Sequence, residues 1–99
     1  MLLFIEPDRQ AEFERFEERA ASIMSRHGGR LERRISFPSR DDASQPHELH
    51  LVIFPDRESF DRYRRDPDLQ ALAGLRATSI RQTVVWEGVD PSPFGPGNQ

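Results

Sequence analysis

Two polar side chains in the second half of the chain stand where they could act on a bound molecule. His50 lies inside an apolar run, and Arg76 follows a leucine-rich stretch that ends at Leu75. A histidine between apolar neighbours can act as a general base or orient a substrate carbonyl. An arginine at a pocket mouth can hold a carboxylate through paired hydrogen bonds. We therefore take His50 and Arg76 as the candidate catalytic residues.

Both residues also have a purely structural interpretation, which the sequence leaves open. His50 fits a histidine at an interface between two copies, or one packed against helices with its ring nitrogens hydrogen-bonded. Arg76 fits a charge at the C-terminus of a helix, paired with a nearby acid. An enzyme would gather such groups around a cavity of a few hundred Å³, whereas a non-catalytic protein would fill its interior.

Two aromatic residues are candidates for substrate binding. Tyr63 and Trp86 each combine an apolar ring with a polar tip, and either can line a pocket between a helix and the sheet. Packing in the core is the alternative for both. Trp86 shares a predicted strand face with Gln82, whose amide would then reach the same cavity.

The sequence predicts neither a metal site nor a cofactor. There is no cysteine, and His47 and His50 are three residues apart on a predicted strand, so their side chains point to opposite faces. His27 closes a predicted helix, where its charged form suits the C-terminus. Asp41 and Asp42 lie in a predicted loop, and no phosphate-binding glycine loop or nucleophile elbow is present.

Length and composition limit the class of protein. The chain has 99 residues, enough for one domain, with 35% hydrophobic and 31% charged residues and a net charge of −3. This charge gives no reason to expect nucleic acid as a partner. No apolar run reaches the roughly 20 residues of a membrane span, and the first run is too short for a secretion signal. We expect a cytoplasmic protein that does not bind membranes.

The first half of the chain predicts strand, helix, strand. Met1–Ile5 is an apolar run, and Asp8 is placed to cap a helix over Arg9–His27. Gly28-Gly29 ends this helix through a left-handed residue, and a strand follows over Arg30–Phe37. The helix has an apolar stripe and an opposite, solvated face; the stripe holds Phe13, Phe16, Ala20, Ile23 and Met24, and the solvated face holds Glu14, Glu17 and Glu18.

The second half repeats this pattern after a polar loop at Ser39–Pro46. A strand over Glu48–Phe54 is apolar on both faces, and Asp56 caps a helix over Arg57–Arg65. Asp66-Pro67 breaks that helix, with Pro67 in the first turn of a second piece. The last strand covers Ile80–Glu87. Residues 1–88 form the predicted domain, and 89–99 form a flexible tail rich in proline and glycine, in which Phe94 is the single residue able to dock.

The resulting βαββαβ order predicts a ferredoxin-like α+β fold. Its antiparallel four-stranded sheet has the strand order 4-1-3-2, with both helices on one face. Strands one and three are central, which agrees with their apolar character. The other sheet face would then expose a large apolar patch, so we expect a second copy to pack sheet against sheet in a homodimer.

The run LVIFPDRESFDRYRRDPDLQALAGLR, followed by a strand ending VVWEG, resembles the DUF1330-like and antibiotic-biosynthesis-monooxygenase-like families of the dimeric α+β barrel superfamily. The resemblance covers nearly all of residues 1–88. It departs at Ile53, where related chains often have an acid, and at Leu69, where they often have an aromatic residue.

The resemblance implies a dimeric α/β barrel and a small-molecule-binding, monooxygenase-like domain. Its chemistry would be cofactor-independent oxygenation or isomerisation of an aromatic or polyketide-like substrate. The alternative is a non-catalytic homodimeric interaction or sensing module with a packed interior. The sequence leaves open whether the protein is an enzyme.

Overall fold

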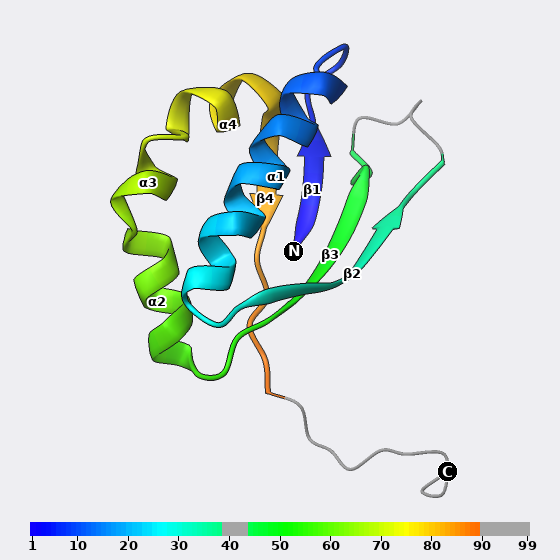
Figure 1. The fold of residues 1–99 in the computed structure, drawn as a ribbon. Coiled ribbons are helices and arrows are strands. Elements are labelled where there is room, and N and C mark those ends of the chain that lie inside the picture. The colour runs from blue at the N-terminus through cyan, green and yellow to red at the C-terminus, as the bar shows by residue number, and fades with distance from the viewer. Residues whose placement is uncertain (39–43, 90–99) are drawn as a thin grey trace, which may run out of the picture.

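The structure, a computed structural model, describes residues 1–38 and 44–89. These residues form one four-stranded sheet with its helices gathered on one side (Figure 1). In chain order the elements are β1 (Leu2–Ile5), α1 (Gln10–Arg26), β2 (Arg30–Ser36), β3 (Glu48–Ile53), α2 (Arg57–Arg65), α3 (Pro67–Gln70), α4 (Ala73–Ser79) and β4 (Ile80–Val84).

The predicted α+β fold is confirmed. The strands lie in the order β2-β3-β1-β4, and every neighbouring pair is antiparallel. The two central strands are β1 and β3, the strands predicted to be central from their largely apolar sequences, although β3 also buries Glu48 and His50. In β1, Leu3, Phe4 and Ile5 are all buried, as expected for a strand covered by neighbours on both edges.

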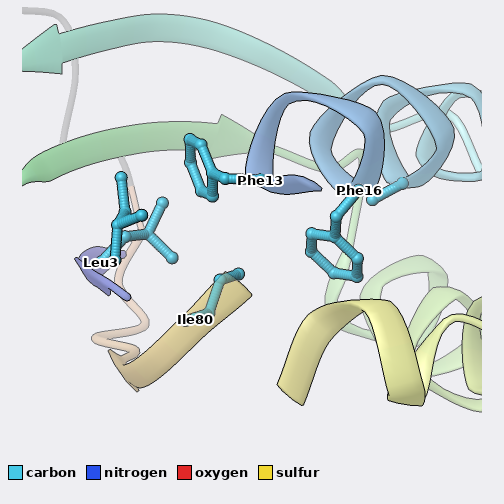
Figure 2. Close-up of a cluster of buried hydrophobic side chains, with 6 residues drawn as sticks. Leu3, Phe13, Phe16 and Ile80 are labelled. Atoms are coloured by element: carbon cyan, nitrogen blue, oxygen red, sulfur yellow. The ribbon is translucent and has the colours of Figure 1, made fainter. Parts of the chain in front are cut away.

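Two apolar clusters join the helices to the sheet. The first packs α1 against β1 and the start of β4; Figure 2 shows Phe13 and Phe16 pointing toward Leu3 and Ile80. The second joins α1 to α2 through Ile23, Met24 and Tyr63. Burial of each large side chain stabilises the fold by about 1.5–3 kcal/mol, so these clusters hold the helices in place over the sheet.

The sheet face turned away from the helices, here called the open face, is largely apolar. Cross-strand pairs place Leu2 opposite both Leu49 and Val84, and Leu49 also lies opposite Ile35. Leu51, two residues beyond Leu49 on the same face of β3, is 49% exposed. Within the described chain this face has no helix covering it, as the sequence predicted.

The helix ends agree with the sequence except at the start of α1. Asp56 accepts a hydrogen bond from the Ser59 N–H, and Asp66 accepts one from the Asp68 N–H, so both predicted caps are confirmed. The predicted cap at Asp8 is wrong, because α1 begins at Gln10 and Asp8 adopts a left-handed backbone with φ of 60°.

The turn after α1 needs its two glycines for different reasons. Gly28 has φ of +76°, the left-handed conformation expected just beyond a helix C-terminus. Gly29 lies so close to Phe54 and Met24 that a Cβ atom would lie 2.4 Å and 2.7 Å from their side chains. The turn therefore brings β2 directly against the second cluster.

Three predicted segments differ in detail. The piece after Pro67 is two short helices, because the chain turns at Ala71 and Leu72 between α3 and α4. β4 ends at Val84, before Trp86. An irregularity in β2 places Leu31 opposite Val52 but Arg33 opposite Leu51, so Leu31 and Arg33 face opposite sides instead of sharing one.

No helix of residues 1–38 and 44–89 has the length and apolar character required to cross a membrane. The predicted tail over 89–99, apart from Val89, and the acidic pair Asp41 and Asp42 lie outside the described residues.

Candidate functional site

A cavity of about 660 Å³ lies between the helices and the helix-facing side of the sheet. Its apolar lining comes from all four strands and from the helices, α1 most of all, and includes Phe16, Met24 and Ile80. Its polar lining comes from α1, β3, α2, α4 and the segment after β4, and includes Glu17, His50, Tyr63, Arg64, Arg76 and Glu87.

His50 lies on the inner wall of this cavity and is only 3% exposed. It projects from β3 toward α1, where its ring lies 6.3 Å from the ring of Phe13. Its Nε2 is 2.8 Å from Oε1 of Glu48, and its Nδ1 is 3.4 Å from Oε2 of Glu17. Both ring nitrogens therefore face carboxylates of the same chain.

Glu48 continues this arrangement away from the cavity. It is buried beside His50 on the same face of β3, and Arg34 of β2 donates to it through Nε at 2.6 Å and Nη2 at 2.8 Å. Arg34 also donates to Glu14 of α1 through Nη1 at 3.2 Å. We call the five residues Glu14, Glu17, Arg34, Glu48 and His50 the charge network.

The charge network favours a protonated His50. Burial alone lowers the pKa of its imidazole, but the adjacent carboxylates of Glu17 and Glu48 outweigh burial and raise that pKa above the ordinary 6.5. Burial raises the pKa of the Glu48 carboxyl, and the hydrogen bonds from Arg34 and His50 reverse this and lower it below 4.5. The two carboxylates therefore favour the imidazolium form of His50.

This arrangement predicts how stability depends on pH. Because the His50 pKa is higher in the folded than in the unfolded chain, its contribution is complete below about pH 6.5 and is lost as pH rises through the folded value. Native protein should therefore exceed His50→Gln in stability by an amount that shrinks with rising pH. Each unit of pKa difference corresponds to about 1.4 kcal/mol. Denaturant unfolding of both proteins from pH 6 to pH 9 measures this difference, and a constant difference would contradict the prediction.

Tyr63 and Arg76 lie on the cavity walls opposite the sheet. Burial and the negative charge of Glu17 raise the pKa of Tyr63 to about 12, and the positive charge of Arg76, which acts in the opposite direction, only partly offsets them. Its hydroxyl therefore stays protonated and can donate a hydrogen bond. Arg76 is exposed at the mouth of the cavity, where its Nη2 donates to Oγ1 of Thr83 at 3.0 Å.

The structure brings three of the four candidate residues together. His50, Tyr63 and Arg76 all line the cavity. Trp86 is 77% exposed and lies outside the lining, whereas its neighbours Val85 and Glu87 belong to it. The alternation along an extended segment places the indole on the side of the open face.

The other two histidines make local contacts elsewhere. His27 follows α1, as predicted, and its Nε2 lies 2.9 Å from Oδ2 of Asp66 at the junction of α2 and α3. Nδ1 of His47 accepts a hydrogen bond of 2.9 Å from the Ile5 N–H. In the described part of the chain, no group of three or more His, Asp or Glu side chains is arranged to hold a metal ion.

Sequence reasoning missed the two carboxylates next to His50. The prediction that Glu17 lies on a solvated face is wrong, because its side chain is only 20% exposed and faces His50, whereas Glu14 is exposed as predicted but also pairs with Arg34. A signal was present, since residue 17 follows Phe13 by four positions and therefore lies on the apolar stripe. Glu48 and His50 are two residues apart on a strand, where alternate side chains share a face, so their proximity could also have been predicted.

A protein-family model described as "Domain of unknown function (DUF1330)" matches residues 2–89. The matched span contains every helix and strand described above. No curated protein and no solved structure shows significant similarity to the chain.

Proposed function

The chain belongs to the DUF1330 family of domains of unknown function, and we propose that it is a cofactor-independent isomerase of small enolisable carbonyl compounds. The observation that carries the proposal is the pair of Glu17 and His50 on the cavity wall, with Glu48 buried behind His50. A carboxylate backed by a buried imidazolium and a second carboxylate is suited to accepting and returning a proton.

The proposed reaction is a proton transfer between carbon and oxygen. Glu17 removes a proton from the carbon next to the substrate carbonyl, and the electrons of that C–H bond move to the carbonyl oxygen. The Tyr63 hydroxyl, which stays protonated, donates a hydrogen bond to the enolate oxygen that forms. Return of the proton to oxygen, or to another carbon, completes the isomerisation without any oxidant.

His50 supports this step as a positioning residue. Its Nδ1–H faces Glu17, and its Nε2–H is held by Glu48, which Arg34 fixes in turn. When Glu17 takes up the substrate proton, His50 keeps its own protons and holds Glu17 in place through Nδ1–H until that proton returns to the substrate. The apolar lining by Phe16, Met24 and Ile80 suits an aromatic or polyketide-like substrate.

Exchange of substrate hydrogens with deuterium tests this proposal. Native protein in D₂O should accelerate loss of the α-proton NMR signal of aryl ketones and aryl oxo acids. Glu17→Gln should slow this exchange by about 10²–10⁴-fold, the usual contribution of a general base. The matched control is Glu18→Gln, one residue further along α1 and exposed, which should keep the native rate.

Two results would change the assignment. Consumption of O₂ together with exchange would identify an oxygenase, because oxygenation begins with the same deprotonation. Absence of exchange for every substrate would reject the isomerase. It would favour the non-catalytic sensing or interaction module, for which the engagement of both His50 nitrogens by carboxylates within the chain is the supporting observation.

We further propose that the protein is a homodimer that packs open face against open face. The exposure of Leu51 and Ile35, together with the apolar pairs around Leu49, supports this. Light scattering at micromolar concentration should give twice the chain mass, and Leu51→Arg, opposite Arg33, should give a folded monomer. A native monomer under these conditions would contradict the dimer.

A further inference from the structure

We propose that Arg76 binds a carboxylate of the substrate, so that the site takes aryl-substituted oxo acids rather than neutral ketones. The inference rests on the proposed isomerase function and adds the chemical class of its substrate. Its basis is the distribution of charge around the cavity. The charged side chains Glu17, Arg64 and Glu87 are paired with charged or aromatic groups of the chain. Among the described residues, the Arg76 side chain contacts only a neutral hydroxyl.

The other charged groups of the lining are engaged within the chain. Glu17 faces His50 at 3.4 Å, and Glu87 pairs with Nη1 of Arg57 at 3.1 Å. The guanidinium of Arg64 lies over the ring of Phe60, 5.4 Å from its centroid. The carboxylates that line the cavity are therefore balanced by cations that the chain itself supplies.

Arg76 differs from these groups. Among the residues that the structure describes, no carboxylate lies within 4.0 Å of its guanidinium, and its polar side-chain contact is the neutral hydroxyl of Thr83. Thr83 of β4 accepts from one guanidinium nitrogen, which leaves further N–H groups of Arg76 able to donate. Two such donors in a planar guanidinium match the geometry of a carboxylate.

Tyr63 relates this anchor to the proposed base. Glu17, Tyr63 and Arg76 all line the same cavity, so one small molecule can contact all three. A molecule whose carboxylate binds Arg76 would present its adjacent carbonyl to Tyr63 and its acidic C–H to Glu17. This order of groups is that of a 2-oxo acid.

The apolar part of the lining favours an apolar substituent on the ligand, in addition to its carboxylate and carbonyl groups. Phe16, Met24, Leu69 and Ile80 line the cavity, and none of them offers a polar side-chain group. A flat apolar substituent on the carbon that loses its proton would occupy this region. An aryl oxo acid contains all three parts in one small molecule.

Phenylpyruvate and phenylacetone form a matched pair for the test, since a methyl group in the second replaces the carboxylate of the first. Native protein should exchange the benzylic hydrogens of phenylpyruvate at least ten times faster than those of phenylacetone at low concentration, each relative to its uncatalysed rate. Arg76→Gln should lose this preference, with a KM for phenylpyruvate raised about 10–100-fold, the range of a charge-assisted hydrogen-bonded pair. Arg65→Gln, an exposed arginine outside the lining, is the control and should behave as native.

A binding measurement separates this inference from the isomerase function. Calorimetry should show 3-phenylpropionate binding to native protein and to Arg65→Gln, with affinity lost in Arg76→Gln. Equal exchange of phenylacetone and phenylpyruvate would overturn the carboxylate anchor and leave the isomerase intact. Binding of 3-phenylpropionate that depends on Arg76, without exchange of either ketone, would support the anchor and reject the isomerase. Unchanged binding in Arg76→Gln would overturn the anchor.

Discussion

Arg34→Met is expected to lower the free energy of unfolding by about 2–4 kcal/mol at neutral pH. Arg34 supplies two hydrogen bonds to the buried Glu48 and further contacts to Glu14, so its removal leaves a carboxylate in the interior with only His50 as a counter-charge. Breaking a buried ion pair costs about 3–5 kcal/mol when one partner stays charged. Because the Arg34 side chain is partly exposed, the expected loss in the free energy of unfolding lies toward the lower end of the range for a fully buried ion pair.

Arg15→Met is the matched control for this variant. Arg15 is an exposed arginine of α1 that lies outside both the charge network and the open face. Its substitution should change stability by less than about 0.5 kcal/mol. The double variant Arg34→Met with Glu48→Gln should recover part of the loss, since the uncompensated charge is gone. Urea unfolding measures all three, and equal losses for Arg15→Met and Arg34→Met would contradict the buried-charge argument.

Phe13→Ala is expected to lower the free energy of unfolding by about 3–5 kcal/mol, the range for truncating a buried phenylalanine. Phe13 is fully buried in the first apolar cluster. The guanidinium of Arg34 lies over its ring at 5.6 Å, and its ring also lies beside that of His50. The substitution therefore removes core packing and one wall of the charge network together.

Phe60→Ala removes the same atoms from a partly exposed position of the second cluster and should cost about 1–2 kcal/mol. If Phe13→Ala does not fold, Phe13→Leu keeps most of the apolar volume and is expected to lose less than about 1.5 kcal/mol. Denaturant unfolding compares the three variants. A smaller loss for Phe13→Ala than for Phe60→Ala would show that burial does not govern these positions.

The strand order was predictable because burial leaves a direct trace in the sequence of this chain. Strand β1 is apolar on both faces and β3 is apolar on its open face, with Glu48 and His50 buried on its other face, and strands of such buried composition favour central positions in a sheet. The Asp56 and Asp66 caps were predictable for a local reason, since each acts on an N–H two or three residues away. The predicted cap at Asp8 was wrong because Arg9 occupies the N-cap position and Asp8 adopts a left-handed backbone conformation just before it.

The candidate site was predictable only in part. Residue types and apolar neighbours identified His50, Tyr63 and Arg76, but they identified Trp86 equally, although the strand ends before it and its indole remains exposed. The pairing of Arg34 with Glu48 joins residues 14 positions apart and depends on the register of β2 and β3, which an irregularity in β2 shifts. A single sequence does not specify such an irregularity, so the partners of His50 required the assembled sheet.

Leu69 and Leu72 have a consequence for how the molecule comes apart. Both pack against the first apolar cluster and against the second, so neither cluster can open while the other stays intact without exposing these leucines. The two halves of the βαββαβ order are therefore one cooperative unit and not two subdomains of separate stability. Amide protons in the middle of α1 and in β1 then exchange with solvent through the same global opening. The walls of the cavity consequently form and melt with the fold itself.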